Sequence, residues 1–163
     1  MTKVIQQYLY VSVVSLEFPT ILLGILFGLV WHQPLQVIAS DISSTEEIVK
    51  HIALLPSLFF GWDCIEARKL LFPEEDKRGA LQAWDDYWRY KIHYHVALFY
   101  GALFALCGFT IWAFGLLPST PTGLAFSAMA NIGALTVSVS IFLARDTVRE
   151  MLIRAKDNPN ACC

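Results

Sequence analysis

The chain has 163 residues, of which 56% are hydrophobic and 16% are charged, and its formal net charge is -2. Soluble domains carry about 25% charged residues, so this composition argues against a soluble globular protein. The length allows a single domain, residues 1–163, and no basic cluster of nucleic-acid-binding type stands apart from the apolar segments. We therefore expect an integral membrane protein and exclude nucleic acid as a partner.

Four apolar segments are long enough to be transmembrane helices, since a span needs about 20 largely apolar residues. The predicted spans are residues 10–31, 48–65, 94–117 and 124–143. The second is the least apolar, because Lys50, His51 and Asp63 lie near its ends. The fourth has no polar face that would suit the surface of a soluble protein. The predicted fold is therefore all-α, an integral membrane four-helix bundle.

The basic residues are distributed unevenly around these spans. Eleven of the twelve Lys and Arg residues precede the first span, lie between the second and third, or follow the fourth. By the positive-inside rule these segments are cytoplasmic. We predict that both termini are cytoplasmic, together with a loop at 66–93 and a tail at 144–163. The protein would be a multi-pass protein of a bacterial inner membrane or its eukaryotic equivalent.

Residues 74–93 are predicted to form an amphipathic helix ahead of the third span. Leu81, Trp84, Trp88 and Ile92 recur at spacings of three and four residues, which places them on one helical face. This pattern is typical of an interfacial helix that lies on the inner leaflet of the membrane. It fits equally well a docking surface for a cytoplasmic partner.

Small residues recur within the first, third and fourth predicted spans, and Gly24 and Gly28 form a GxxxG pair. In lipid, small side chains one turn apart let two helix backbones approach closely. The residues expected to pack helices together are Gly24, Gly28, Gly101, Ala105, Ala130, Asn131 and Ala134. Packing inside the bundle is the preferred interpretation, and binding of another chain through one such face is the alternative.

Ionisable residues from all four spans fall near one depth on the predicted cytoplasmic side. The predicted polar cluster comprises Glu17, Asp63, Glu66, His93, His95, Arg145 and Asp146. Glu17 lies inside the first span, about 10 Å along a helix from Tyr10. A lone carboxylate at that depth costs several kcal/mol unless it is paired or protonated. We expect Asp63 to be its neighbour.

Three interpretations of this cluster compete. In the first, Arg145 or a histidine neutralises Glu17 or Asp63, and the network sets the helix register. In the second, the cluster is a proton or ion site at the mouth of a transport path, because an ionisable residue inside a membrane usually serves such a path. In the third, the carboxylates and one histidine bind iron, manganese or zinc.

The histidines restrict the metal interpretation. The sequence His-Tyr-His on a helix places the rings of His93 and His95 about 200° apart, so we expect only one of them to face the bundle. Haem is disfavoured, because no pair of histidines at matching depth lies inside the apolar layer. No cofactor is predicted, and a metal ion enters only under the third interpretation.

No catalytic motif is present in the sequence, and the predicted loops are short. We therefore expect a non-enzymatic subunit or binding partner in a membrane complex, in contact with lipid and with a protein partner or further copies of itself. The first alternative is an oligomeric proton- or ion-coupled transporter or channel that uses Glu17. The second alternative is a membrane metalloenzyme with a carboxylate and histidine site.

Overall fold

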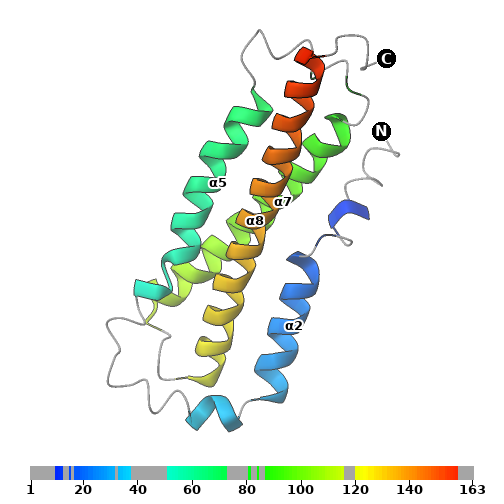
Figure 1. Cartoon of the computed structure of the whole chain (residues 1–163). Helices are drawn as coiled ribbons and strands as arrows, with labels where there is room; N and C mark the ends of the chain where they lie inside the picture. The colour runs from blue at the N-terminus through cyan, green and yellow to red at the C-terminus, as the bar shows by residue number, and fades with distance from the viewer. Residues whose placement is uncertain are drawn as a thin grey trace.

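The computed structural model describes residues 10–12, 15, 17–31, 33–37, 51–72, 81, 84, 87–115 and 120–157. Its principal helices are α2 (Glu17–Val30), α5 (Leu55–Leu71), α7 (Tyr87–Ala113) and α8 (Pro121–Asp157) (Figure 1). The described part of the chain contains helices and no strands, which confirms the predicted all-α class. By length and composition, two of these helices could cross a membrane: α7, and α8 from Pro121 to Ile153.

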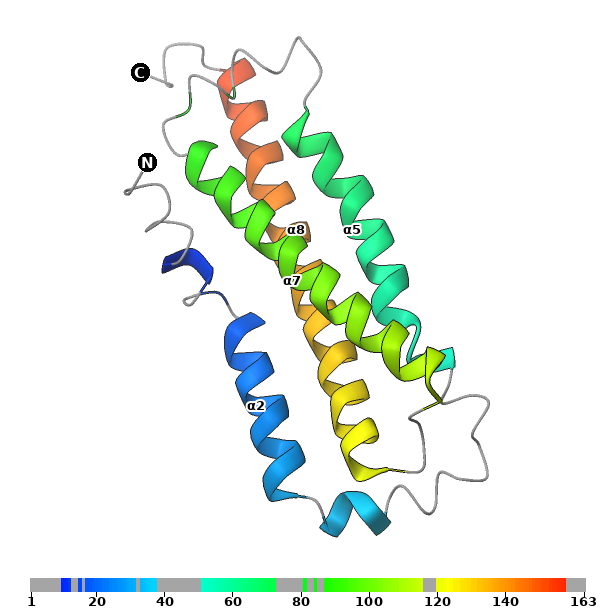
Figure 2. The same ribbon diagram turned by 180° about the vertical axis from the view of Figure 1, so that it is seen from behind.

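Successive helices in this set run in opposite directions (Figures 1 and 2). We call the end of the bundle where α5 ends, α7 begins and α8 ends the basic end, because its described residues include Arg68, Lys69, Lys91, Arg145 and Arg149. The opposite end, where α8 begins, is called the Pro121 end. This antiparallel arrangement brings the charged ends of three helices together.

The core is built by α5, α7 and α8, which all pack against one another. Its fully buried members include Ile92 and Phe104 of α7 and Val137 and Ile141 of α8. Helix α2 packs on α8 (Figure 1). Helices α2 and α5 therefore flank α8 on different sides, and α8 is the element that joins the two parts of the bundle.

The glycines of the predicted packing set lie at close helix contacts. A Cβ atom on Gly28 would lie 3.3 Å from the Cβ atom of Ala125, and one on Gly24 would overlap the side chain of Met129. The GxxxG pair of α2 is thus occupied by α8. Between α7 and α8, a Cβ atom on Gly133 would overlap the ring of Phe104.

The remaining packing residues lie inside the bundle, with one exception. Gly101, Ala105, Ala130 and Ala134 are buried. A Cβ atom on Gly101 would lie 3.1 Å from the ring of Phe60 in α5. Asn131 is half-buried, and it donates a hydrogen bond from Nδ2 to the carbonyl oxygen of Ser127, at 2.9 Å. It therefore differs from the others, because its amide brings polar atoms into the helix interface.

Three helices extend beyond the bounds of the predicted spans. α5 continues to Leu71, α7 begins at Tyr87, and α8 continues to Asp157. A hydropathy pattern ends where charged residues begin, whereas backbone hydrogen bonding continues through Arg and Lys, which are good helix formers. The helices therefore extend past their apolar segments at the basic end.

The first predicted span differs more strongly from its observed helix. α2 begins only at Glu17 and has 14 residues, or about 21 Å of helix. Residues 10–12 are helical, but Ser15 lies in a bend. Pro19 falls in the first turn of α2, where its missing N–H would have no partner within the helix. Proline therefore fits the start of α2 and would have broken a continuous helix through this point.

The predicted face of residues 74–93 is not a single surface. Residues 74–80 lie outside the described part of the chain. Ile92 is fully buried, whereas Trp88 is 48% exposed, and Trp84 packs against Tyr90 with ring centroids 4.9 Å apart. The reason is that residues 87–93 belong to α7 itself, so its first turns already pack into the bundle.

Candidate functional site

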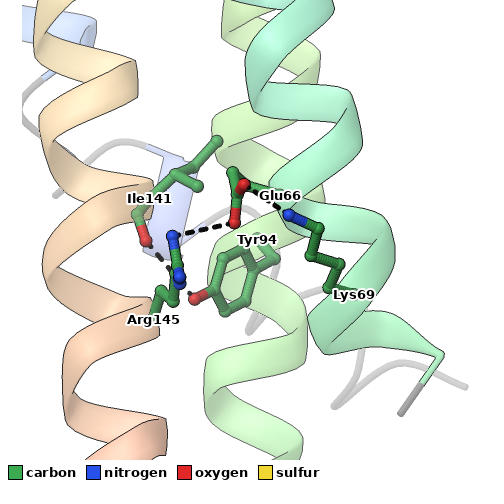
Figure 3. A network of polar contacts seen from close by, with 5 residues as sticks. All are labelled: Glu66, Lys69, Tyr94, Ile141 and Arg145. Carbon is green, nitrogen blue, oxygen red and sulfur yellow. Dashed lines mark hydrogen bonds and ion pairs between the residues drawn. The ribbon is translucent and has the colours of Figure 1, made fainter. Parts of the chain in front are cut away.

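Glu66 forms the centre of an ion-pair network at the basic end (Figure 3). Its Oε1 lies 2.7 Å from Nζ of Lys69, one turn further along α5, and its Oε2 lies 3.0 Å from Nη1 of Arg145 on α8. The Glu66 carboxylate is buried, while both cations reach solvent. One anion between two cations is well compensated, so this network joins α5 to α8 in a defined register.

Tyr94 faces the bundle at the same level and is not among the residues predicted for the polar cluster. It is buried and donates a hydrogen bond from its hydroxyl to the carbonyl oxygen of Ile141, at 3.5 Å. His93 is half-buried and His95 is exposed. Successive residues of a helix point about 100° apart, so Tyr94 points between the directions of the two histidines, and this direction faces the bundle. The His-Tyr-His pattern was the signal in the sequence that could have identified Tyr94.

His95 and Asp146 take no part in the buried site. The ring Nδ1 of His95 donates to the carbonyl oxygen of Lys91, at 2.7 Å, which fixes the ring along its own helix. Asp146 is exposed, one residue after Arg145. Within the described part of the chain, no three His, Cys, Asp or Glu side chains come close enough together to hold a metal ion.

Asp63 lies deeper, between α5 and α8. Its side chain is 1% exposed, and Oδ2 accepts a hydrogen bond from the hydroxyl of Ser138, at 3.0 Å. Oδ1 is buried and has no hydrogen-bond partner among the described residues. The network pairs Arg145 with Glu66, and no cation in the described ranges pairs with Asp63. One hydroxyl therefore supplies all the polar contact observed at this carboxylate.

Glu17 has even less polar contact. Its side chain is 1% exposed, and over the described residues neither Oε1 nor Oε2 has a hydrogen-bond partner. Buried polar groups in proteins are almost always hydrogen-bonded, and a buried charge without a partner is costly. A carboxyl group in this position can hold a proton or attract a cation. It is the least compensated ionisable group that the structure describes.

The bend before Glu17 is held from α7. The hydroxyl of Tyr100 donates to the carbonyl oxygen of Ser12, at 3.1 Å, and the hydroxyl of Ser15 donates to the same carbonyl oxygen, at 2.8 Å. These two hydrogen bonds supply partners for the carbonyl oxygen of Ser12, which lies where the bend interrupts regular helical hydrogen bonding. Tyr100 is a second residue that sequence reasoning missed, because its partner lies 88 positions away.

The depth of Glu17 follows from the register of α2 on α8. Gly24 lies against Met129 and Gly28 against Ala125. In this antiparallel register, Glu17 lies level with residue 136 of α8, two residues from Ser138. At 1.5 Å per residue, Glu17 and Asp63 are within about 3 Å of each other in depth.

The two carboxylates nevertheless lie on different sides of α8. Met129, on the side of α2, and Ser138, on the side of α5, are nine residues apart. At 100° per residue these side chains point in directions about 180° apart. The expectation that Asp63 neighbours Glu17 is therefore wrong, although the predicted common depth holds. The site consists of two separate buried carboxylates.

An apolar cavity of about 600 Å³ lies near the Pro121 end, between α7 and α8. Its lining includes Cys107, Thr110 and Phe126. The hydroxyl of Thr110 already donates to the carbonyl oxygen of Leu106, at 2.7 Å. No carboxylate lines this cavity, so it is distinct from both buried acids.

Comparisons with protein-family models, with curated proteins and with solved structures find no match to this chain.

Proposed function

We propose that this chain is a multi-pass membrane protein that moves protons or a small monovalent cation across the membrane as an oligomer. The observation that carries the proposal is the pair of buried carboxylates, Glu17 and Asp63, which lie at one depth with three of their four oxygens unpartnered among the described residues. Ionisable groups inside a membrane are costly and usually mark a proton or ion pathway.

The distribution of polarity supports the membrane setting. The outward face of α8 is apolar, with Ile132, Leu135 and Phe142 all more than half exposed. The polar residues of the bundle are inside instead, and Ser127 and Ser138 are at most 6% exposed. Contiguous exposed apolar surface is unfavourable in water, whereas a lipid environment accepts it.

An oligomer is part of the proposal because a bundle of this size has little room for a pore of its own. Its core contains large side chains such as Phe104 and Ile141, both about 1% exposed. A path between or along helices, completed by further copies, would bring the buried acids into contact with the transported ion.

Flux measurements in proteoliposomes test the proposal. The purified protein is reconstituted with an entrapped pH-sensitive dye, and a potassium diffusion potential is applied; a sodium-sensitive dye serves a parallel set of vesicles. We expect the wild-type flux to exceed that of empty vesicles. The flux of Glu17→Gln and of Asp63→Asn should each be at least tenfold lower than that of the wild type. Each substitution keeps the side-chain size while removing the charge.

Asp146→Asn is the matched control, because it removes an exposed carboxylate from the same end of the molecule. Its flux should equal that of the wild type. Wild-type flux no higher than in empty vesicles would overturn the proposal. Unchanged flux in both Glu17→Gln and Asp63→Asn would do the same.

A subunit of a membrane complex is the second candidate function. It is favoured by α2, whose packing partner among the described helices is α8 and whose other side presents long apolar side chains, including Leu23, Leu26 and Leu29. These side chains suit another apolar helix in lipid. Purification in mild detergent followed by mass spectrometry should then recover one constant partner chain. Recovery of this chain alone would contradict the subunit assignment.

A further inference from the structure

One face of α8 carries a line of polar residues along most of its length. These residues are Ser127, Asn131, Ser138 and Arg145, spaced by four, seven and seven positions. At 100° per residue they fall within a sector of about 40°, and they extend over about 27 Å. That length is close to the thickness of the hydrocarbon core of a bilayer, about 30 Å.

Helix α5 places both of its carboxylates on this line. Asp63 accepts a hydrogen bond from Ser138 at 3.0 Å. Glu66 pairs with Arg145 at 3.0 Å (Figure 3). We call this interface the polar seam, defined by Asp63 and Glu66 of α5 and by Ser127, Asn131, Ser138 and Arg145 of α8. Helix α2 lies on the other side of α8, so Glu17 is outside the seam.

Two acceptor atoms along the seam are buried without a partner in the described part of the chain: Oδ1 of Asp63 and Oδ1 of Asn131. The Asn131 amide donates to Ser127, so its oxygen is the group left over. Both atoms can accept a hydrogen bond from water or from a hydrated proton. Between their levels lies Ala134, a buried residue with a small side chain.

We propose that the polar seam is a hydrated path by which a proton reaches Asp63 from the basic end, with Asn131 the next polar group toward the Pro121 end. This inference rests on the proposed transport function and names the ion and the part of the route that passes Asp63; Glu17 belongs to a separate part of it. The proton is favoured over a metal cation, because Glu66, one turn along α5, is already paired with Lys69 and Arg145. Asp63 is left with a single hydroxyl among the described residues. A serine hydroxyl can pass a proton, whereas a hard metal cation needs several oxygen ligands.

The seam also has a defined mouth. Glu66 holds Arg145 and Lys69 at the basic end, where both cations reach solvent. From Arg145 to Ser138 is seven residues, or about 10 Å along α8. Asp63 therefore lies about two helical turns inside the mouth, and Asn131 lies another two turns beyond.

Cysteine labelling tests the path independently of flux. In the 163-residue chain with its four native cysteines replaced by serine, Asn131→Cys and Ser138→Cys are compared with Ile132→Cys and Val139→Cys. The latter pair lies one position further along the same helix and is exposed on its outer face. The variants are reconstituted in proteoliposomes and treated with 2-aminoethyl methanethiosulfonate, which modifies thiols that meet water.

We expect the two seam cysteines to react at least tenfold faster than the two outer-face cysteines. Equal or slower reaction at both seam positions would overturn the hydrated path. Size-exclusion profiles that match the cysteine-free parent ensure that the variants compared are folded. Each seam position has an adjacent residue of α8 as its control. A general loosening of α8 would therefore raise all four labelling rates together, and this result would also count against the path.

Flux in the cysteine-free parent separates this inference from the proposed function. Proton flux with unreactive seam cysteines would leave the transport function standing and overturn the seam as its route. Reactive seam cysteines without flux of either ion would support hydration of the seam and overturn transport. Sodium flux in place of proton flux would support the proposed function and overturn the proton as the ion of the seam.

Discussion

At the scale of single residues, three buried carboxylates have three different environments. Glu66 has two cations within 3.0 Å, Asp63 has one hydroxyl, and Glu17 has no polar partner among the described residues. A carboxylate between two cations is explained by the packing of α5 on α8. A carboxylate without a partner is costly to bury, and no packing contact of such a carboxylate offsets this free energy. The ion pairs give Glu66 a structural explanation, whereas Asp63 and Glu17 are the carboxylates on which the proposed function rests.

Removing the hydroxyl of Ser138 should destabilise the bundle. In Ser138→Ala, Oδ2 of Asp63 loses the hydrogen bond observed at 3.0 Å, which leaves both oxygens unpartnered within the described structure. A buried acceptor left without a partner costs about 1–3 kcal/mol. Unfolding in mixed micelles would measure the loss. Ser140→Ala, half-buried on the same helix, is the control, and equal stability of the two variants would contradict the role of the hydrogen bond.

At the scale of helices, glycine determines how closely α8 approaches its neighbours. Gly133 lies under the ring of Phe104 in α7, and Gly24 lies against Met129 across the interface with α2. By contrast, a Cβ atom on Gly61 of α5 would meet nothing within 4 Å. Close approach of this kind is a main source of helix association in lipid, where burial of apolar side chains gives no gain over contact with lipid tails.

Alanine in place of these glycines should have opposite effects at two positions. Gly133→Ala forces the ring of Phe104 to move, and such overpacking costs about 1–3 kcal/mol. Gly61→Ala adds a better helix former at an open position and should gain about 0.5–1 kcal/mol. The same unfolding assay in micelles measures both. A neutral or stabilised Gly133→Ala variant would show that α7 and α8 are not held in close contact at this point.

At the scale of the whole molecule, polarity is arranged from the inside outward. Buried acids and serines line the interior, while the outward faces of α7 and α8 present leucine, isoleucine and phenylalanine. The charged ends of α5, α7 and α8 meet at the basic end, which the alternating helix directions require (Figure 2). Together with the positive-inside rule, this arrangement predicts that the basic end faces the cytoplasm.

Labelling of single cysteines tests this orientation. In a cysteine-free background, Ser119→Cys lies between the third and fourth predicted spans, on the side opposite the predicted cytoplasmic loop. Lys77→Cys lies in that loop. A membrane-impermeant maleimide should modify the first in intact spheroplasts and the second only after permeabilisation. The reverse pattern would invert the topology, and labelling of both in intact cells would contradict a shared cytoplasmic side for the basic segments.

Much of the fold was predictable from local sequence properties. Hydropathy located the apolar parts of α7 and α8, and the small residues of α2 marked the surface that meets α8. Residue depth was also predictable, because each residue advances a helix by a fixed rise. Glu17 and Asp63 were placed at a common depth from the apolar segments alone. These properties depend only on neighbours along the chain.

The partners of each side chain depended on the tertiary structure. The sequence suggested that Arg145 neutralises Glu17 or Asp63, but Arg145 pairs with Glu66. It suggested that Glu17 adjoins Asp63, but α8 lies between them.

The sequence by itself determined the all-α class, the apolar segments and the common level of Glu17 and Asp63 along the bundle, because rise and hydropathy are local. Only the tertiary structure decided which acids are compensated. Compensation depends on which face of each helix meets its neighbour and in what register, and the close approaches at Gly24 and Gly133 set those two quantities across distant parts of the chain.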